Sequence, residues 1–178
     1  MFEGWDSFYL LVGGAAGAMI GLFFIVVTLI RGGDTGLKLR GASVYMTPTV
    51  AHLAMVLLLS AVATAPGLPM PLVGVIFGGC ALTCLGFTAR ALFMFVTESI
   101  KASHWSDVWA YSVCPFGACL VMTASVAALW VTPVWAIRGI AASVVFLLLI
   151  AIRNAWDLVT WITATRGGDL EASNPDGG

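Results

Sequence analysis

Five long apolar blocks make up most of the chain, and short polar or proline- and glycine-rich segments separate them. The blocks cover residues 8–30, 43–65, 71–96, 107–131 and 134–156, and the last keeps a helical character to about residue 165. None alternates apolar and polar residues as the strands of a membrane barrel do. About 20 apolar residues rising 1.5 Å each cross a hydrocarbon core of ~30 Å. The pattern therefore predicts an all-α integral membrane protein, a bundle of five transmembrane helices.

The connections are short, which limits what can lie outside the bundle. Residues 31–41 (RGGDTGLKLRG) and 97–107 (TESIKASHWSD) are polar, whereas 66–71 (PGLPMP) and 132–133 (TP) are tight turns. Residues 167–178 have no apolar periodicity, and we expect them to form a disordered polar tail. Residues 1–166 then form a single transmembrane domain. Its first residues are acidic, unlike the basic start of a secretory signal.

Composition agrees with this class and excludes others. Hydrophobic residues make up 60% of the chain and charged residues 10%, against roughly 25% charged residues in soluble domains. The net charge is −1 and there is no basic tract, so we expect a lipid bilayer and no nucleic acid as a partner. All four cysteines lie inside apolar blocks, where we interpret them as small packing residues rather than a disulfide framework. They are Cys80, Cys84, Cys114 and Cys119.

Basic residues orient the predicted bundle. Lys and Arg near span ends favour the cytoplasmic side. With five spans, only Arg138 lies on one side, and the other side holds Arg31, Lys38, Arg40, Arg90, Lys101, Arg153 and Arg166. This places the N-terminus outside and the C-terminus in the cytoplasm, in a multi-pass protein of the plasma membrane, of the bacterial inner-membrane type. Tryptophans, which prefer the interface, fall near predicted span ends throughout.

Glycine and proline indicate helix packing and helix shape. Gly13, Gly17 and Gly21 form a repeated GxxxG pattern, a glycine zipper on which another helix can approach closely. The stripe is interpreted as packing within the chain, with a contact between copies or a pore lining as the alternatives. Pro48 and Pro115 each remove a helical hydrogen bond and should kink their helices. These kinks either let the helices wrap around one another or provide a hinge or a wider inner vestibule.

His52 is the ionisable residue that the sequence places deepest in the membrane. Such a residue is a candidate functional group by default. It is either a structural imidazole bonded to a carbonyl or Thr hydroxyl, or a proton relay or a ligand of metal or haem. An eight-residue match between residues 48–55 (PTVAHLAM) and 115–122 (PFGACLVM) pairs His52 with Cys119, which suggests a repeated helical hairpin. Cys119 joins His52, Pro48 and Pro115 as a candidate pore or relay residue.

Several possible metal ligands lie close together on the same helix. His52 with Met55, Cys119 with Met122, and Cys80 with Cys84 have spacings of three or four residues, and thiolate, thioether and imidazole ligands suit soft ions such as Cu(I). No short CxxC or HxxxH motif exists, so the sequence analysis assigns no metal, no cofactor-binding residue and no cofactor.

Charged residues near the cytoplasmic interface complete the candidates. Asp157 has two possible partners, Arg153 at i, i+4 and Arg90 at a similar depth. We interpret these ion pairs as anchors of the last helix. The sequence has no P-loop, GxSxG or HExxH motif, so an enzyme is disfavoured and no catalytic residue is assigned.

Two functions remain from the sequence. The first is a small channel or transporter subunit that acts on a small ion or solute as a homo-oligomer. The second is a non-transporting accessory or scaffold protein that binds another membrane component.

Overall fold

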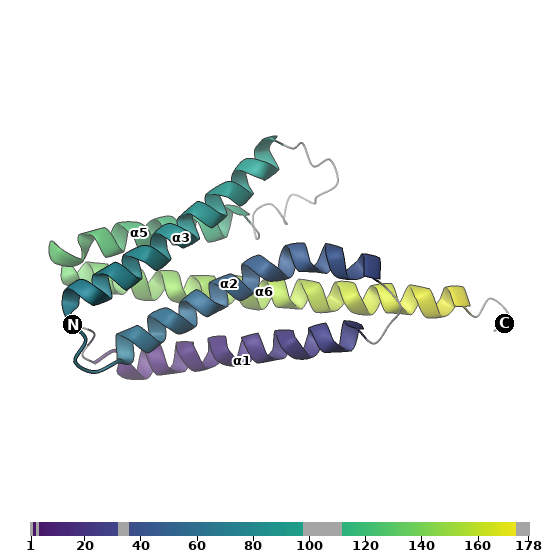
Figure 1. Ribbon diagram of the computed structural model, residues 1–178, viewed down its shortest axis with the longest axis horizontal. Coiled ribbons are helices and arrows are strands. Elements are labelled where there is room, and N and C mark those ends of the chain that lie inside the picture. Colours follow the sequence, from purple (N-terminus) through teal and green to yellow (C-terminus); the bar gives the residue numbers. More distant parts are fainter. Residues whose placement is uncertain (1, 3, 32–35, 98–111, 174–178) are drawn as a thin grey trace.

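The part of the chain that the structure describes folds into five α-helices that run alternately in opposite directions (Figure 1). The computed structural model describes residues 2, 4–31, 36–97 and 112–173. The helices are α1 (Asp6–Arg31), α2 (Gly36–Thr64), α3 (Met70–Thr97), α5 (Cys114–Ala127) and α6 (Pro133–Ser173), and a short 3-10 turn, η2 (Ala128–Trp130), follows α5. The described residues contain no strand. The predicted all-α class is therefore confirmed.

Three of the helices are long and apolar enough to cross a membrane. These segments are Asp6–Val26, Met70–Phe93 and Pro133–Asp157. The apolar parts of the other two, Thr49–Thr64 and Cys114–Trp130, are shorter. The structure thus contains a helix in each of the five predicted blocks, with three candidate spans among the described residues. The predicted start of the fourth block, residues 107–111, lies outside the described residues.

α6 lies at the centre of the bundle. Of its apolar segment, 56% is buried within the protein, compared with 28% for α1 and 33% for α3. It packs against α1, α2 and α5. The helix also continues to Ser173 and so includes residues 167–173, which the sequence analysis placed in the polar tail. Gly167 and Gly168 are a signal for a helix end, but the helix continues through them, and no proline interrupts the chain between Pro133 and Pro175.

Close contacts at small residues fix how the helices are paired. A Cβ atom on Gly13 of α1 would lie 2.8 Å from the Ser60 Cβ atom of α2. On α3, Gly74 faces the Trp130 ring and Gly78 faces Val126. Gly139 of α6 faces Ser125 of α5. Backbones approach closely where side chains are this small, which is how packing stabilises helix pairs in lipid.

Each helix buries a stripe of residues spaced three or four apart. On α2 this stripe is Thr49, His52, Leu53, Val56, Leu59 and Ser60. On α3 it is Val73, Phe77, Ala81, Cys84 and Thr88. The opposite faces carry exposed Leu, Val and Phe side chains. Spacing of three and four residues places side chains on one helix face, so His52 and Cys84 both face the interior.

Candidate functional site

A polar cluster lies inside the bundle where α2, α3 and α5 meet. Each helix contributes one side chain, His52, Cys84 and Cys119 respectively, and the ligand atoms of these residues all lie within 4.8 Å of one another. His52 is 4% exposed, and both cysteines are fully buried. The cluster therefore brings together an imidazole and two sulfur atoms from segments far apart in the sequence.

The cluster is near the middle of the bundle along the helix axes. Cys84 lies fourteen residues after Met70 and thirteen before Thr97, at the centre of α3. His52 lies twelve residues before Thr64, the end of α2, which is roughly 18 Å along the helix. Cys119 lies eleven residues before Trp130, the end of η2. Similar distances from the same end of the bundle explain how the three residues meet.

Cys84 and Cys119 form a disulfide in the structure, with their Cα atoms 5.8 Å apart. The sequence analysis expected no disulfide among the cysteines, so this pair corrects that expectation. The antiparallel register of α3 and α5 is the physical reason. Gly78 faces Val126 across the pair, and moving about two helical turns further along both helices brings Cys84 level with Cys119.

The other two cysteines stay outside the cluster. Cys80 and Cys114 are free thiols with half-buried side chains. In the antiparallel register they are displaced from the cluster in opposite directions along the bundle. The i, i+4 pair of Cys80 and Cys84, considered from the sequence, thus separates into one free thiol and one residue of the cluster.

The His52 ring has an unsatisfied nitrogen at this position. Its buried Nε2 atom has no hydrogen-bond partner among the described residues. Leaving a buried polar atom without a partner costs roughly 1–3 kcal/mol. A buried imidazole nitrogen normally donates or accepts a hydrogen bond, or binds a metal ion. The interpretation of His52 as a hydrogen-bonded structural imidazole therefore leaves Nε2 unexplained.

Two methionines lie one turn from members of the cluster. Met122 follows Cys119 by three residues on α5 and is fully buried. Met55 follows His52 by three residues on α2 and is half-buried. Thr49, one turn before His52, is also buried. The surroundings of the cluster are thus apolar and sulfur-rich, a setting that suits soft ligand chemistry.

The structure describes the two prolines that were predicted to kink their helices to different extents. The side chain of Pro48 lies outside the described residues, although α2 includes this position. Pro115 is buried in the first turn of α5, directly after a π-helical turn at residues 112–113. A π-turn accommodates a missing backbone hydrogen bond by widening the helix.

The glycine stripe of α1 divides between interior and surface. Gly13 is buried against α2, whereas a Cβ atom on Gly17 or Gly21 would meet nothing within 4 Å. One glycine of the stripe therefore packs within the chain, and the other two lie on a face with free space next to them.

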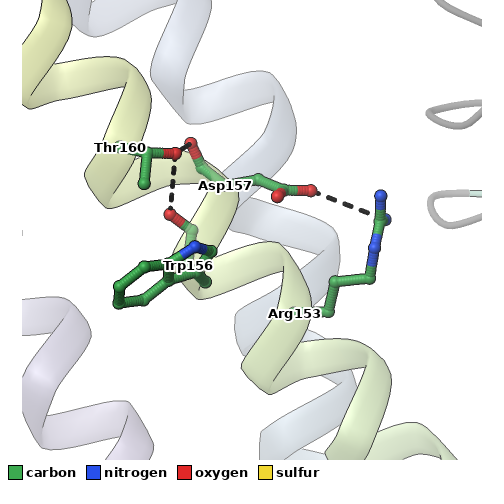
Figure 2. A network of polar contacts seen from close by, with 4 residues as sticks. All are labelled: Arg153, Trp156, Asp157 and Thr160. Carbon is green, nitrogen blue, oxygen red and sulfur yellow. Dashed lines mark hydrogen bonds and ion pairs between the residues drawn. The ribbon is translucent and has the colours of Figure 1, made fainter.

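The predicted ion pair near the end of the last span uses the partner on the same helix. Figure 2 shows Arg153 Nη1 lying 3.5 Å from Asp157 Oδ2, with both side chains partly exposed. In the same view the Thr160 hydroxyl donates to the backbone carbonyl oxygens of Trp156 and Asp157, at 3.1 and 2.9 Å. Arg90 is exposed on α3 and does not take part in this pair.

An open groove lies at the opposite end of the bundle, between α1 and α6. Its volume is about 410 Å³, and it is lined by Trp5, Phe8, Arg138, Ala141, Ala142, Val145, Phe146 and Leu149. The Arg138 guanidinium lies 5.2 Å from the centre of the Trp135 ring. An apolar surface beside an arginine and tryptophans fits the region between acyl chains and head groups.

No family model, curated protein or solved structure matches this chain. The function must therefore be argued from the cluster itself. The sequence identified His52 and Cys119 as candidate residues but paired Cys84 only with Cys80, because each possible metal pair lay on one helix. The match of His52 with Cys119 in the two eight-residue segments was the one signal that linked two helices of the cluster.

Proposed function

We propose that this chain is a small multi-pass membrane protein that acts as a channel or transporter subunit. In this proposal all five helices span the plasma membrane, with the N-terminus outside and the C-terminus in the cytoplasm, and copies of the chain assemble into a homo-oligomer. The route for a small ion or solute passes the cluster of His52, Cys84 and Cys119.

One observation gives this proposal its strongest support. The cluster lies in the buried interior of an apolar bundle, with Cys84 at the centre of the long apolar helix α3, and the His52 Nε2 atom in it has no described partner. Ionisable side chains are costly inside a membrane, and those that are present commonly mark ion, proton or substrate pathways. A bundle that needed only packing at this point would be more stable with an apolar side chain there.

Assembly of copies is supported by the exposed face of α1. Gly14, Gly17 and Gly21 leave free space next to the helix, and exposed Leu and Phe side chains lie on either side of this stretch. Among the described residues, α6 occupies the centre of the bundle and packs against α1, α2 and α5, so a helix fills the place where a pore through one copy would run. A conducting route at an interface between copies therefore fits the architecture better than a pore through a monomer.

The test begins with the oligomeric state of the full chain in detergent, followed by flux in liposomes. We expect an oligomer, and we expect wild-type protein to pass a small cation from a panel of H⁺, K⁺ and Zn²⁺. His52→Ala should change that flux at least several-fold. Leu58→Ala, a partly exposed apolar position on the same helix, is the matched control and should not. A strictly monomeric protein, or flux unchanged by His52→Ala, would contradict the proposal.

The accessory or scaffold function is the alternative that one observation favours. The groove between α1 and α6 is open and almost entirely apolar, as expected for a surface that holds a lipid tail or another helix. No flux of any tested ion, together with a stable complex with a second membrane protein, would favour this alternative.

A further inference from the structure

We propose that His52, Cys84 and Cys119 form an intramembrane binding site for a thiophilic divalent cation of the Zn²⁺ class. The inference goes beyond transport, because such an ion can be held in place as well as moved. It depends on the arrangement of three buried donors and on the unpartnered His52 nitrogen.

The three donors are close enough to bind one metal ion after the Cys84–Cys119 disulfide is reduced. Zinc binds cysteine sulfur at about 2.3 Å and histidine nitrogen at about 2.0 Å, so tetrahedral ligands lie roughly 3.5–3.8 Å from one another. In the structure the three donor atoms lie within 4.8 Å of one another. Because the two sulfurs are bonded to each other in the structure, the disulfide must first be reduced and the cysteine side chains must rotate, so that the sulfurs separate to the spacing of zinc ligands. The backbones already hold the three ligands on facing helices.

The chemistry of the donors selects the class of ion. Two sulfurs and an imidazole suit Zn²⁺ and Cu(I) and exclude Mg²⁺ and Ca²⁺, which require oxygen ligands. The charge then separates the first two. Two thiolates and a neutral imidazole balance Zn²⁺ completely, whereas Cu(I) in the same site carries a net charge of −1. A net charge buried in an apolar interior is costly, so the divalent ion is favoured.

Three protein ligands leave a fourth coordination position open. Zinc sites with four protein ligands are usually structural, while those with three keep a position for water or another ligand. The described residues place no other His, Cys, Asp or Glu ligand within the cluster. The proposed site therefore holds an ion that can exchange rather than one that is permanently enclosed.

The disulfide and the metal site exclude each other, which makes the site depend on the redox state. Reduction of the Cys84–Cys119 disulfide takes two electrons and two protons and gives two thiols. A thiol reductant supplies both and ends as its own disulfide, whereas a phosphine supplies the electrons, takes its oxygen from water and ends as the phosphine oxide, with the protons also coming from water. Binding of Zn²⁺ then releases the two thiol protons to water as two Zn–S bonds form. The same residues thus exist in an oxidised form without metal and a reduced form that binds it.

The experiment is a metal titration of the full chain in detergent after reduction with a phosphine. Alkylation and mass spectrometry count the free thiols in one sample, and elemental analysis measures bound zinc after dialysis in a second sample that is not alkylated. We expect four thiols and one Zn²⁺ per chain. Co²⁺ in place of Zn²⁺ should give a thiolate charge-transfer band and the intense visible absorption of a tetrahedral site. A parallel titration with Cu(I) tests the charge argument.

The variants separate this site from adventitious binding. His52→Ala, Cys84→Ala and Cys119→Ala should each weaken zinc binding by about 100-fold or more, since even outer-shell changes cost 10–100-fold at metal sites. Cys80→Ala and Cys114→Ala remove the two free thiols and should leave binding unchanged. Gel filtration and circular dichroism check the fold of every variant. Where Cys84→Ala fails to fold, His52→Ala and Cys119→Ala decide the result.

Several outcomes would overturn the proposal. These are a disulfide that persists under reductant, less than one equivalent of zinc in the reduced wild type, zinc retained by the folded His52→Ala variant, and tight binding of Cu(I) alone. Its failure is distinguishable from that of the proposed function. Ion flux without zinc binding rejects only the metal site, and zinc binding without flux rejects only transport.

Discussion

The two polar regions of the bundle are built in different ways. The cluster of His52, Cys84 and Cys119 takes one residue from each of three helices and is almost completely buried. The pair of Arg153 and Asp157 lies on one helix, four residues apart, with side chains 45% and 36% exposed. The cluster depends on the tertiary fold, whereas the ion pair requires only that α6 is helical.

This difference predicts how the energy of each region is distributed. Removing one member of a buried group that acts together leaves its partners unsatisfied, so the effects of single changes are large and not additive. An exposed i, i+4 pair is screened by solvent and contributes little. The predictions below test this contrast in order of expected size.

The largest effect is expected for the two cysteines of the cluster. Cys84→Ala and Cys119→Ala should each lower the free energy of unfolding by about 2–4 kcal/mol, because either change removes the cross-link between α3 and α5. The double variant should be no less stable than the single variants. Equilibrium unfolding of all four proteins in mixed detergent micelles, without reductant, measures this double-mutant cycle.

The free thiols provide the control for that cycle. Cys80→Ala and Cys114→Ala remove a sulfur from the same two helices outside the cluster. Their effects should be about 1 kcal/mol or less and should add in the double variant. Additive effects of Cys84→Ala and Cys119→Ala would show that the two residues do not act as a unit, and the contrast with the ion pair would then fail.

The sequence was sufficient to predict the helices, and the reason is physical. In lipid every backbone hydrogen bond must be made within the chain, so a long apolar block is either a helix or part of a closed barrel. The blocks do not alternate apolar and polar residues, which excluded a barrel. All five blocks contain a helix in the structure. The i, i+4 partner of Asp157 was predictable for the same reason, since helix geometry alone places Arg153 beside it.

The partners within the cluster were not predictable from the sequence. In a soluble helix an apolar stripe against a polar face identifies the buried side, but here both faces of each helix are apolar. Val75 and Leu82 are exposed on α3, while Phe77 and Cys84 are buried. Nothing in residue type separates these positions. The register of α3 against α5, which brings Cys84 to Cys119, depends on close contacts such as Gly74 with Trp130.

The close approach of the α1 and α2 backbones at Gly13 should also contribute to the free energy of unfolding, but less than the cluster does. Gly13→Ala should cost about 1–3 kcal/mol, because the new methyl group would lie 2.8 Å from the Ser60 Cβ atom, which moves only with the α2 backbone. Gly17→Ala on the same helix meets nothing within 4 Å and should change stability by about 0.5 kcal/mol or less. Unfolding of both variants in the same micelles gives the comparison.

The two glycines also separate packing within the chain from contacts between copies. Gly17→Leu adds bulk to the open face of α1, so it should reduce self-association in analytical ultracentrifugation while leaving the fold of each copy intact. Equal destabilisation by Gly13→Ala and Gly17→Ala would contradict the described division of the stripe. Unchanged assembly of Gly17→Leu would place any contact between copies elsewhere.

The smallest effect is expected for the ion pair of α6. Arg153→Ala and Asp157→Ala should each change the free energy of unfolding by about 0.5 kcal/mol or less, and their coupling should fall further as salt is added. The order of the charges supports a small value, because an acidic residue that precedes the basic one is the more favourable arrangement on a helix. A double-mutant cycle at low and high salt measures the coupling. A salt-independent coupling above about 1.5 kcal/mol would mean that this end of α6 is shielded from water, and the ion pair would then resemble the buried cluster rather than contrast with it.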